Sequence, residues 1–414
     1  MEPRTQPDPS PLRRALARFA LAVAIVAVVA IGVDRSVGRS NDFDNFYDAA
    51  ASVWENGELL REKGTSRYLP SFQVMMSPFG ALPIEASAPI WILLNLASYA
   101  ALVFLFARVF GVSPRAQIPA WFCVAPFVVS NLTLGQSGPL LLALSTAGIA
   151  AAVHHRDRLA GVALAAAGLL KVLPAALVAI PFFFGRIRGT VVGAGLAAAA
   201  IGVWMTLALG PTAAIDDSLR WFTEVRQVQT PDHLMRTGRS IRYNNQGLAV
   251  TLARTFGDFS PRPQAMARGS TQLLSSPVPL EWVWALYGGI LATLAAVLAA
   301  VLWRLRRHGP GPRGFLAALA LAAPVMLATS PIVWTHYFLW LLPGFIYLSD
   351  RRRALAAISV VSLAAIYWIP ARGLGFHMAL GLVQFGWVAQ DAWRNAGAHG
   401  GTPSPVGASL NSPH

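Results

Sequence analysis

Runs of about 18–25 apolar residues recur along this 414-residue chain, and they limit its possible folds more than any other feature. A helix of that length crosses a hydrocarbon core of about 30 Å. Charged residues make up only 13% of the chain, whereas a soluble domain carries about 25%. The sequence therefore predicts an all-α polytopic membrane protein. The expected spans are roughly 15–33, 89–110, 118–129, 140–153, 190–209, 281–303, 315–327, 334–348, 354–369 and 376–388.

Basic residues are distributed unevenly between these spans. Two long polar segments, 34–88 and 210–279, hold 13 Lys or Arg and 13 of the 19 acids, whereas the short connections and tails on the opposite side hold 18 Arg and five acids. Short loops rich in Lys and Arg stay in the cytosol, and long loops translocate largely regardless of charge. We therefore expect a cell (inner) membrane protein with both termini in the cytosol and both long loops outside. On this reading the net charge of +14 reflects topology, and no nucleic acid partner is expected.

The ends of the chain differ in composition from the membrane region. We expect a cytosolic tail over 1–14, a membrane domain over 15–395 and a cytosolic tail over 396–414, whose Pro, Ser and Gly content predicts disorder. Arginines before the first apolar run also fit a signal peptide, but no clear small-residue cleavage site follows Val33, so a retained span is favoured. Cys123 is the only cysteine, which excludes an internal disulfide.

A short segment between two basic clusters predicts a break at membrane depth. Residues 154–158 and 186–188 carry the clusters, and Lys171 and Pro174 lie midway between them. The intervening chain is too short for two full crossings, so two partial helices meeting near Lys171 are favoured over one bent helix. Such breaks are tolerated where they line a protein cavity. With this pair counted as two, about 12 membrane segments are expected.

The first long loop opens with an acidic and aromatic cluster that contains Asp42 and Asp44. An Asp-x-Asp pair can hold a metal in sugar transferases, but the tripeptide alone is common. The alternative is structural, with either carboxylate capping a short helix that continues through 47–54. The aromatic segment 67–83, which includes Tyr68, fits either a membrane-interface belt or the lining of a groove.

Two further residues stand out because of where they lie. Lys171 is one of two lysines in the chain and lies deep in an apolar run, where a charge by default indicates a functional site. The alternative to a functional site is that Lys171 stands at the end of a helix and its side chain reaches the membrane surface. His336 is expected at the outer end of a span, where a histidine beside aromatic residues is more often structural.

The second long loop contains a cluster of polar residues. Asn245 and Gln246, with Arg254 nearby, suit sugar hydroxyls or phosphate, or else they cap a helix over 248–255. Residues 131–137, which include Gln136, form another expected outer turn. Charged and apolar positions alternate at helical spacing over 215–228, which fits a helix lying along the membrane interface.

Taken together and in order, these motifs resemble one family, glycosyltransferase family 87. The resemblance covers about residues 34–345. The motifs in this order are more specific to the family than any one of them alone. The matching elements are Asp42-Phe43-x-x-Phe46-Tyr47-x-Ala49-Ala50, Gly57, Tyr68-x-Pro70-x-Phe72, Pro78-x-x-x-Leu82-Pro83, Gly135-Gln136, Lys171-x-x-Pro174, Asn245-Gln246 with Arg254, and Ser330-Pro331-x-x-Trp334-x-His336.

The resemblance implies a GT-C-type fold and transfer of a hexosyl unit, with mannose favoured, from a polyprenyl-phosphate sugar to an extracytoplasmic glycolipid or glycan. It implies Asp42 as the general base of an inverting reaction and His336 near the active site. Because the leaving group carries a single phosphate, we expect no cofactor or metal. Tyr337 stands where many mannosyltransferase members carry a second histidine, which leaves the sugar open. The expected substrate-binding residues are Asp44, Tyr47, Tyr68, Gln136, Lys171, Asn245, Gln246, Arg254 and Trp334.

Two other classes fit the same chain. About 12 spans also suit a transporter or a lipid-linked-sugar flippase, although those proteins commonly show internal repeats and midplane sites. A scaffolding subunit of an envelope-assembly complex, or a pseudoenzyme of the same fold, would not need the loop acids.

Overall fold

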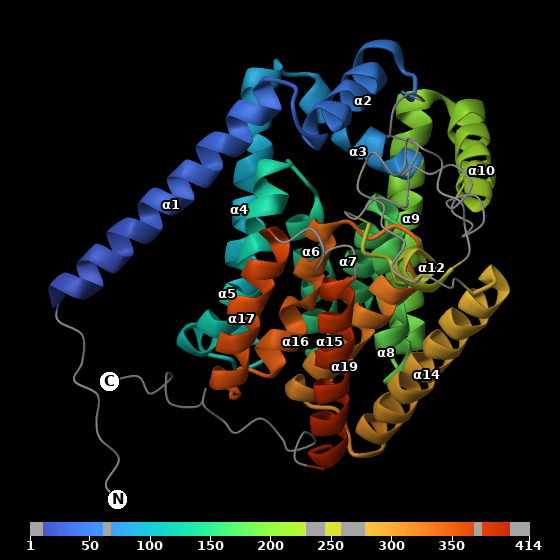
Figure 1. The fold of residues 1–414 in the computed structure, drawn as a ribbon. Helices are drawn as coiled ribbons and strands as arrows, with labels where there is room; N and C mark the ends of the chain where they lie inside the picture. The colour runs from blue at the N-terminus through green and yellow to red at the C-terminus, as the bar shows by residue number, and fades with distance from the viewer. Residues whose placement is uncertain (1–10, 61–67, 229–244, 258–277, 368–374, 398–414) are drawn as a thin grey trace, which may run out of the picture.

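The computed structural model describes residues 11–60, 68–228, 245–257, 278–367 and 375–397 (Figure 1). Within these ranges the chain is helical, and β-type pairing is limited to two isolated bridges. Of the tails expected over 1–14 and 396–414, residues 1–10 and 398–414 lie outside the described residues, while 11–14 belong to the first helix. The helices are α1 (Pro11–Val37), α2 (Asp42–Asn56), α3 (Pro70–Gly80), α4 (Ile84–Arg108), α5 (Pro114–Thr133), α6 (Gly138–Val153), α7 (Asp157–Leu170), η2 (Leu173–Val178), α8 (Ala179–Phe183), α9 (Ile187–Leu209), α10 (Pro211–Val228), α12 (Leu248–Phe256), α14 (Leu280–Arg307), α15 (Pro312–Thr329), η3 (Thr335–Leu341), α16 (Leu342–Tyr347), α17 (Arg352–Tyr367) and α19 (Phe376–Arg394).

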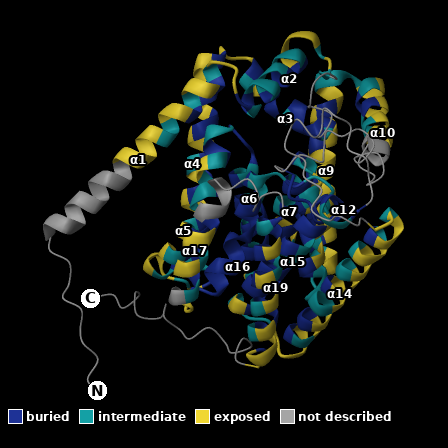
Figure 2. Ribbon diagram, viewed as in Figure 1, coloured by how far each residue is buried: buried dark blue, intermediate teal, exposed yellow. Residues whose placement is uncertain are grey.

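Five of the described helices are long and apolar enough to cross a membrane: α4, α5, α9, α14 and α15. They differ in burial. In the most apolar 18-residue stretch of each helix, 78% of the residues are buried in α15 but only 17% in α9 and α14. Figure 2 shows α15 and α16 in the dark-blue centre of the molecule and exposed residues along α14. Leu207 of α9 and Trp282 of α14 are 81% and 70% exposed, which suits contact with lipid. The molecule is thus a polytopic membrane protein, while the GT-C fold and the total of about 12 segments remain predictions.

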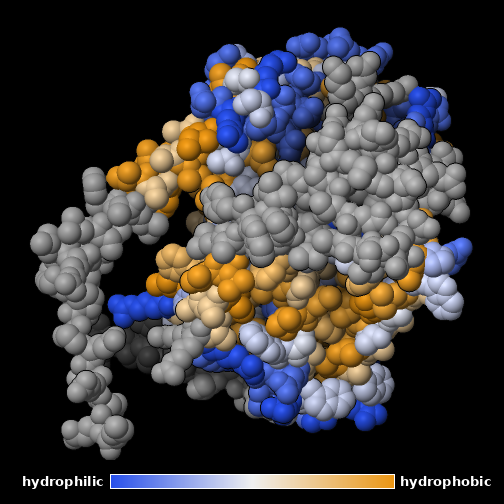
Figure 3. Space-filling model, viewed as in Figure 1, coloured by the Kyte–Doolittle hydropathy of each residue, from blue (hydrophilic) through white to orange (hydrophobic). Residues whose placement is uncertain are grey.

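The space-filling view also indicates a protein that crosses a membrane. Figure 3 shows hydrophilic residues over the α2 end and again around the opposite end near the α14–α15 turn, with hydrophobic residues between them. A band of that kind matches a hydrocarbon layer flanked by two aqueous phases.

The predicted break near Lys171 is confirmed. Helix α7 ends at Leu170, Lys171 is extended (φ −154°, ψ 129°), and the chain turns back through η2 and α8. Pro174 has no N–H to donate to the carbonyl of Leu170, and its ring would collide with that carbonyl in a continuous α-helix, so α7 ends before it. Arg186 Nη1 donates to Asp157 Oδ1 at 3.3 Å, so both basic clusters lie at the same end of the fold. A single bent helix would have separated them.

A second break was not expected. Residues 334–348 were predicted to form one span, but the structure has the 3₁₀ helix η3 followed by the short helix α16. Pro343 stands in the first turn of α16, where its missing N–H interrupts the preceding ladder of hydrogen bonds. Residues 338–348 are buried in the core beside α5 and α15, and His336 lies in η3.

At one end of the molecule, α2 and α3 pack against each other and α10 runs back beside α9 (Figure 1). The predicted helix over 47–54 is part of α2, and the predicted helix over 215–228 is part of α10. Ile215, Leu219 and Phe222 form an exposed apolar stripe on α10. Its placement along a membrane interface remains a prediction.

Candidate active site

The site begins at the first residue of α2. Asn41, and neither of the two aspartates, caps this helix, because its side chain accepts a hydrogen bond from Phe43 N at 2.9 Å. The capping role considered for Asp42 or Asp44 is therefore wrong. Asn41 is held in place by Ser36 Oγ, which accepts from its Nδ2 at 2.8 Å. As a result, the half-buried Asp42 carries its carboxylate at the start of α2 without serving as the cap.

The turn that follows α5 packs directly on this end of α2. Asp42 N donates to Leu134 O at 3.1 Å, and Trp91 Nε1 donates to Gly135 O at 2.8 Å. These bonds fix Gln136, whose Nε2 donates to Asp42 Oδ2. Residues 94 positions apart thus meet in one polar contact, with Gln136 only 4% exposed.

Gly135 is required at the centre of this turn. Its φ is +62°, and a Cβ there would collide with the side chain of Phe43. Gly135→Ala should cost about 1–2 kcal/mol through left-handed strain and a further 1–3 kcal/mol or so through overpacking. Thermal unfolding in detergent measures the loss. Gly111→Ala is the matched control, because Gly111 also has positive φ but its Cβ would meet nothing within 4 Å. Equal melting temperatures for the two variants would contradict the close packing of the turn on Phe43.

Lys171 reaches the same region from the break after α7. Its Nζ lies 4.8 Å from the ring centre of Tyr68 and 4.2 Å from that of Tyr337, and it donates to Tyr68 Oη at 3.4 Å. Aromatic faces attract cations, and more strongly where water is excluded. Among the described residues, no carboxylate pairs with this ammonium group. The cation is therefore held by ring faces and a hydroxyl.

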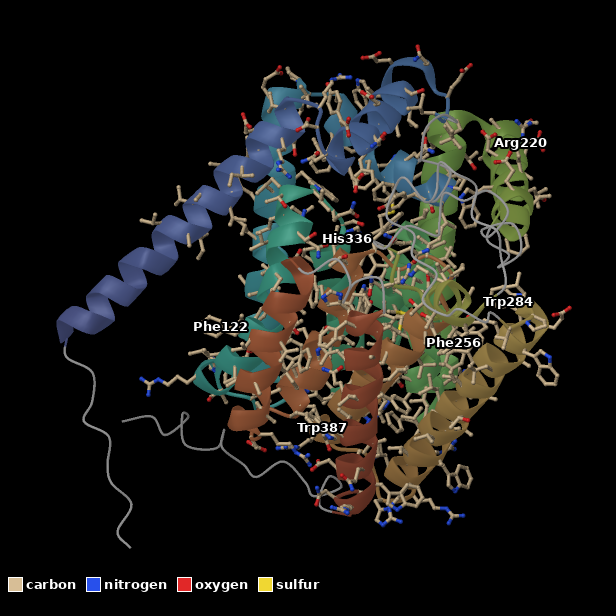
Figure 4. All side chains as sticks on the ribbon, viewed as in Figure 1. Phe122, Arg220, Phe256, Trp284, His336 and Trp387 are labelled. Atoms are coloured by element: carbon tan, nitrogen blue, oxygen red, sulfur yellow. The ribbon has the colours of Figure 1, made fainter. Side chains whose placement is uncertain are left out.

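His336 faces the same place from η3. Asn131 Nδ2 donates to His336 O at 2.9 Å, which fixes the backbone of η3 against α5. The side chain is 6% exposed, and its Nε2 has no hydrogen-bond partner among the described residues. Figure 4 shows His336 in the interior of the molecule. A buried imidazole nitrogen of this kind can bond to a ligand.

Two cavities meet at Lys171 and Tyr337. The smaller, with a volume of about 10 Å³, is also lined by Gln136 and His336 and has room for a single water molecule. The larger measures about 700 Å³, and most of the side chains that line it are apolar, including Trp221, Phe222 and Ile332. The arrangement thus places the Lys171 cation at both cavities and the His336 imidazole at the smaller one. The Asp42 carboxylate lies behind Gln136, which lines the smaller cavity.

Comparisons with known proteins fit this site. The family model described as glycosyltransferase family 87 matches residues 67–331, more than half of the chain. The chain belongs to glycosyltransferase family 87. It is 29% identical over 374 residues to a polyprenol-phosphate-mannose-dependent alpha-(1-2)-phosphatidylinositol mannoside mannosyltransferase of Mycolicibacterium smegmatis, which covers 80% of this chain and 76% of that protein. A protein of the same description from Mycobacterium tuberculosis is 27% identical over 367 residues, covering 80% and 77%. No solved structure matches the chain significantly.

The protein is thus a glycosyltransferase, and the family match covers only part of its site. Tyr68, Gln136 and Lys171 lie inside the matched residues, whereas Asp42 and His336 lie outside them. The contacts described above bring all five together, although their individual roles remain predictions.

Three other predicted residues of this glycosyltransferase hold a backbone segment. Asn245 Oδ1 accepts from Val333 N at 3.0 Å, and Gln246 N donates to Val333 O at 2.7 Å. Asn245 also forms a β-bridge with Trp334. Arg254, which is fully buried, donates from Nη1 to Asn245 O at 3.1 Å, and burial lowers its pKa to about 10. These contacts fix the segment before η3, and direct substrate binding by these residues remains a prediction.

The buried guanidinium suggests a stability test. Arg254→Met should lower the stability by about 1–3 kcal/mol, because Asn245 O loses a donor inside the protein. Thermal unfolding measures this loss, and Arg220→Met on the exposed face of α10 (Figure 4) is the control. An unchanged melting temperature together with a higher KM for the sugar donor would instead make Arg254 a substrate contact.

Asp44 and Tyr47 make their observed contacts away from Lys171. Asp44 Oδ1 accepts from Asn45 N at 2.9 Å, and burial raises the pKa of its carboxyl. The Tyr47 hydroxyl donates to Leu82 O at 2.9 Å at an exposed position. Their predicted contacts with substrate remain untested.

Sequence reasoning missed two structural parts of the site. Asn131, which holds η3, was noted only as the start of a turn, and Trp91, which holds the 134–136 turn, lay inside a predicted span. Tyr337 was noted only as a departure from a motif, yet its ring is the closer of the two beside Lys171. An indole side chain within an apolar span was the available signal for Trp91, and the predicted end of the span at 129, before α5 actually ends, concealed Asn131.

Proposed function

We propose that this protein is a membrane mannosyltransferase that takes mannose from a polyprenyl-phosphate carrier and passes it to a glycolipid acceptor. The printed names of its two relatives support this donor and suggest a phosphatidylinositol mannoside as the first acceptor to test. The reaction inverts the anomeric centre, and Asp42 is its general base. The uneven distribution of Arg supports an active site on the extracytoplasmic face of the cell membrane.

The observation that carries this proposal is the position of Lys171 between the two cavities. A polyprenyl-phosphate sugar has an isoprenoid chain, a single phosphate and a sugar, in that order. The 700 Å³ apolar pocket suits part of the chain, and the ammonium group at its edge suits the phosphate. The sugar then extends toward Gln136 and Asp42, with the smaller cavity widening to admit it.

The displacement follows from these positions. The acceptor hydroxyl forms a bond to the anomeric carbon and gives its proton to the Asp42 carboxylate. The bond between that carbon and the phosphate oxygen breaks on the opposite face, and its electron pair leaves with polyprenyl phosphate. Lys171 and His336 stabilise the charge that develops on this leaving group. An oxocarbenium-like transition state makes even a weak base effective, because the proton becomes acidic as the new bond forms.

A direct transfer assay tests the proposal. The purified protein in lipid nanodiscs is supplied with radiolabelled polyprenyl-phosphate mannose, glucose or arabinose and with a phosphatidylinositol mannoside. We expect label to pass from the mannose donor to the glycolipid and product analysis to show inversion. Absence of transfer from every polyprenyl donor, combined with uptake of donor into sealed vesicles, would establish a carrier instead.

A further inference from the structure

Lys171 and Asp42 are joined by a continuous chain of hydrogen bonds. Lys171 Nζ donates to Tyr68 Oη at 3.4 Å, Tyr68 Oη donates to Gln136 Oε1 at 3.3 Å, and Gln136 Nε2 donates to Asp42 Oδ2. The four residues come from four separate segments: the start of α2, the residues before α3, the turn after α5 and the break after α7. We propose that Tyr68 and Gln136 are positioning residues, which hold the base in place and link it to the phosphate-binding lysine. This inference rests on the proposed function, because it takes Asp42 as the base.

The chemistry of the groups fixes the direction of the chain. An ammonium group only donates and a carboxylate only accepts, so the tyrosine hydroxyl must accept from Lys171 and donate to the amide oxygen. If the Gln136 amide were turned over, its oxygen would face the carboxylate of Asp42, acceptor against acceptor. Only one arrangement satisfies all four groups, and the Gln136 amide must therefore present its N–H to the base.

The middle of the chain is rigid. Gln136 N donates to Asn131 O at 2.9 Å, and Tyr68 stacks on Phe72 with ring centres 4.5 Å apart. Phe46 packs on Tyr68 edge to face at 4.9 Å. Gln136 and Tyr68 are 4% and 9% exposed. A base held by a buried and packed neighbour keeps its orientation without having to be ordered in each catalytic cycle.

An amide neither takes up nor releases a proton at neutral pH, so Gln136 does not relay one. Its N–H stabilises the ionised form of the carboxylate. Without this donor, the Asp42 carboxyl would stay protonated up to a higher pH and would adopt more than one orientation. This role differs from the direct substrate contact that the sequence predicts for Gln136 and Tyr68.

The test compares Gln136→Ala and Tyr68→Phe with Gln117→Ala. Gln117 is a matched control, because it is also a fully buried glutamine but donates to Val103 O and Val112 O, away from the site. For Gln136→Ala we expect kcat to fall about 10–100-fold and the acidic limb of the pH profile of kcat/KM to move up by about one unit, with the donor KM unchanged. Tyr68→Phe should produce smaller changes of the same sign. Gln117→Ala should leave the pH profile where it is.

An infrared titration gives a readout that needs no turnover. The carboxyl band of Asp42, identified by its loss in Asp42→Asn, should titrate at higher pH in Gln136→Ala than in the unmodified protein. An unmoved band would overturn the inference, and a raised donor KM with unchanged kcat and pH profile would make Gln136 a substrate contact. Failure of the proposed function looks different, since the unmodified protein would then transfer no sugar from any polyprenyl donor.

Discussion

Asp42→Asn should lower the rate of mannosyl transfer by about 10²–10⁴-fold, the usual contribution of a positioned general base. Asparagine has nearly the same shape as aspartate, and its amide oxygen can still accept from Gln136 Nε2. It cannot take the proton of the acceptor hydroxyl. The loss should therefore appear in kcat, with the donor KM nearly unchanged and the protein folded and inserted in the membrane.

Asp48→Asn on the same helix is the matched control for this experiment. Asp48 forms an exposed ion pair with Arg39 at 3.0 Å, and its side chain is 44% exposed. Exposed pairs contribute about 0–1 kcal/mol to stability, so this variant should keep both its fold and its activity. Near-normal turnover by Asp42→Asn would remove Asp42 from the mechanism, and equal losses in the two variants would indicate general damage to α2.

The second large effect is expected at Lys171. A hydrogen bond between charged groups contributes about 1.5–3 kcal/mol, which corresponds to roughly 10–150-fold in affinity. Lys171→Met should raise the donor KM by about this factor, because methionine fills similar space without the charge. Donor titrations at saturating acceptor measure the change.

Stability measurements separate this effect from unfolding. The ammonium group lies between the rings of Tyr68 and Tyr337, where desolvation is costly. Lys171→Met should thus melt at the same temperature as the unmodified protein or higher, while Lys171→Arg should retain part of the donor affinity. An unchanged donor KM in Lys171→Met would exclude a phosphate contact.

The sequence predicted those features that depend on local composition or on charge. The five membrane-length helices followed from apolar runs, and the break at Lys171 followed from two basic clusters too close together for two full crossings. The η3–α16 break was missed although Pro343 was a local signal for it, because this proline stands in a largely apolar run. Burial in the core, which tolerates irregular backbone there, is a tertiary property.

The site was predicted as a set of residues but not as an arrangement. A cap by Asp42 or Asp44 was one of two roles left open for these residues, and Asn41 was not considered, because its position as the cap depends on contacts with Ser36 and Thr133. The contact of Gln136 with Asp42 joins residues 94 positions apart, which no local pattern specifies.

The way in which Lys171 is held has a consequence for turnover. Its ammonium group is flanked by two neutral rings, so, within the part of the chain that the structure describes, an arriving phosphate displaces no acidic side chain. The carrier sugar is a phosphodiester with one negative charge, whereas the spent carrier is a monoester that approaches two near neutral pH. The same lysine therefore attracts the spent carrier at least as strongly as the loaded one. Release of the lipid phosphate, rather than formation of the glycosidic bond, is then the step that limits turnover.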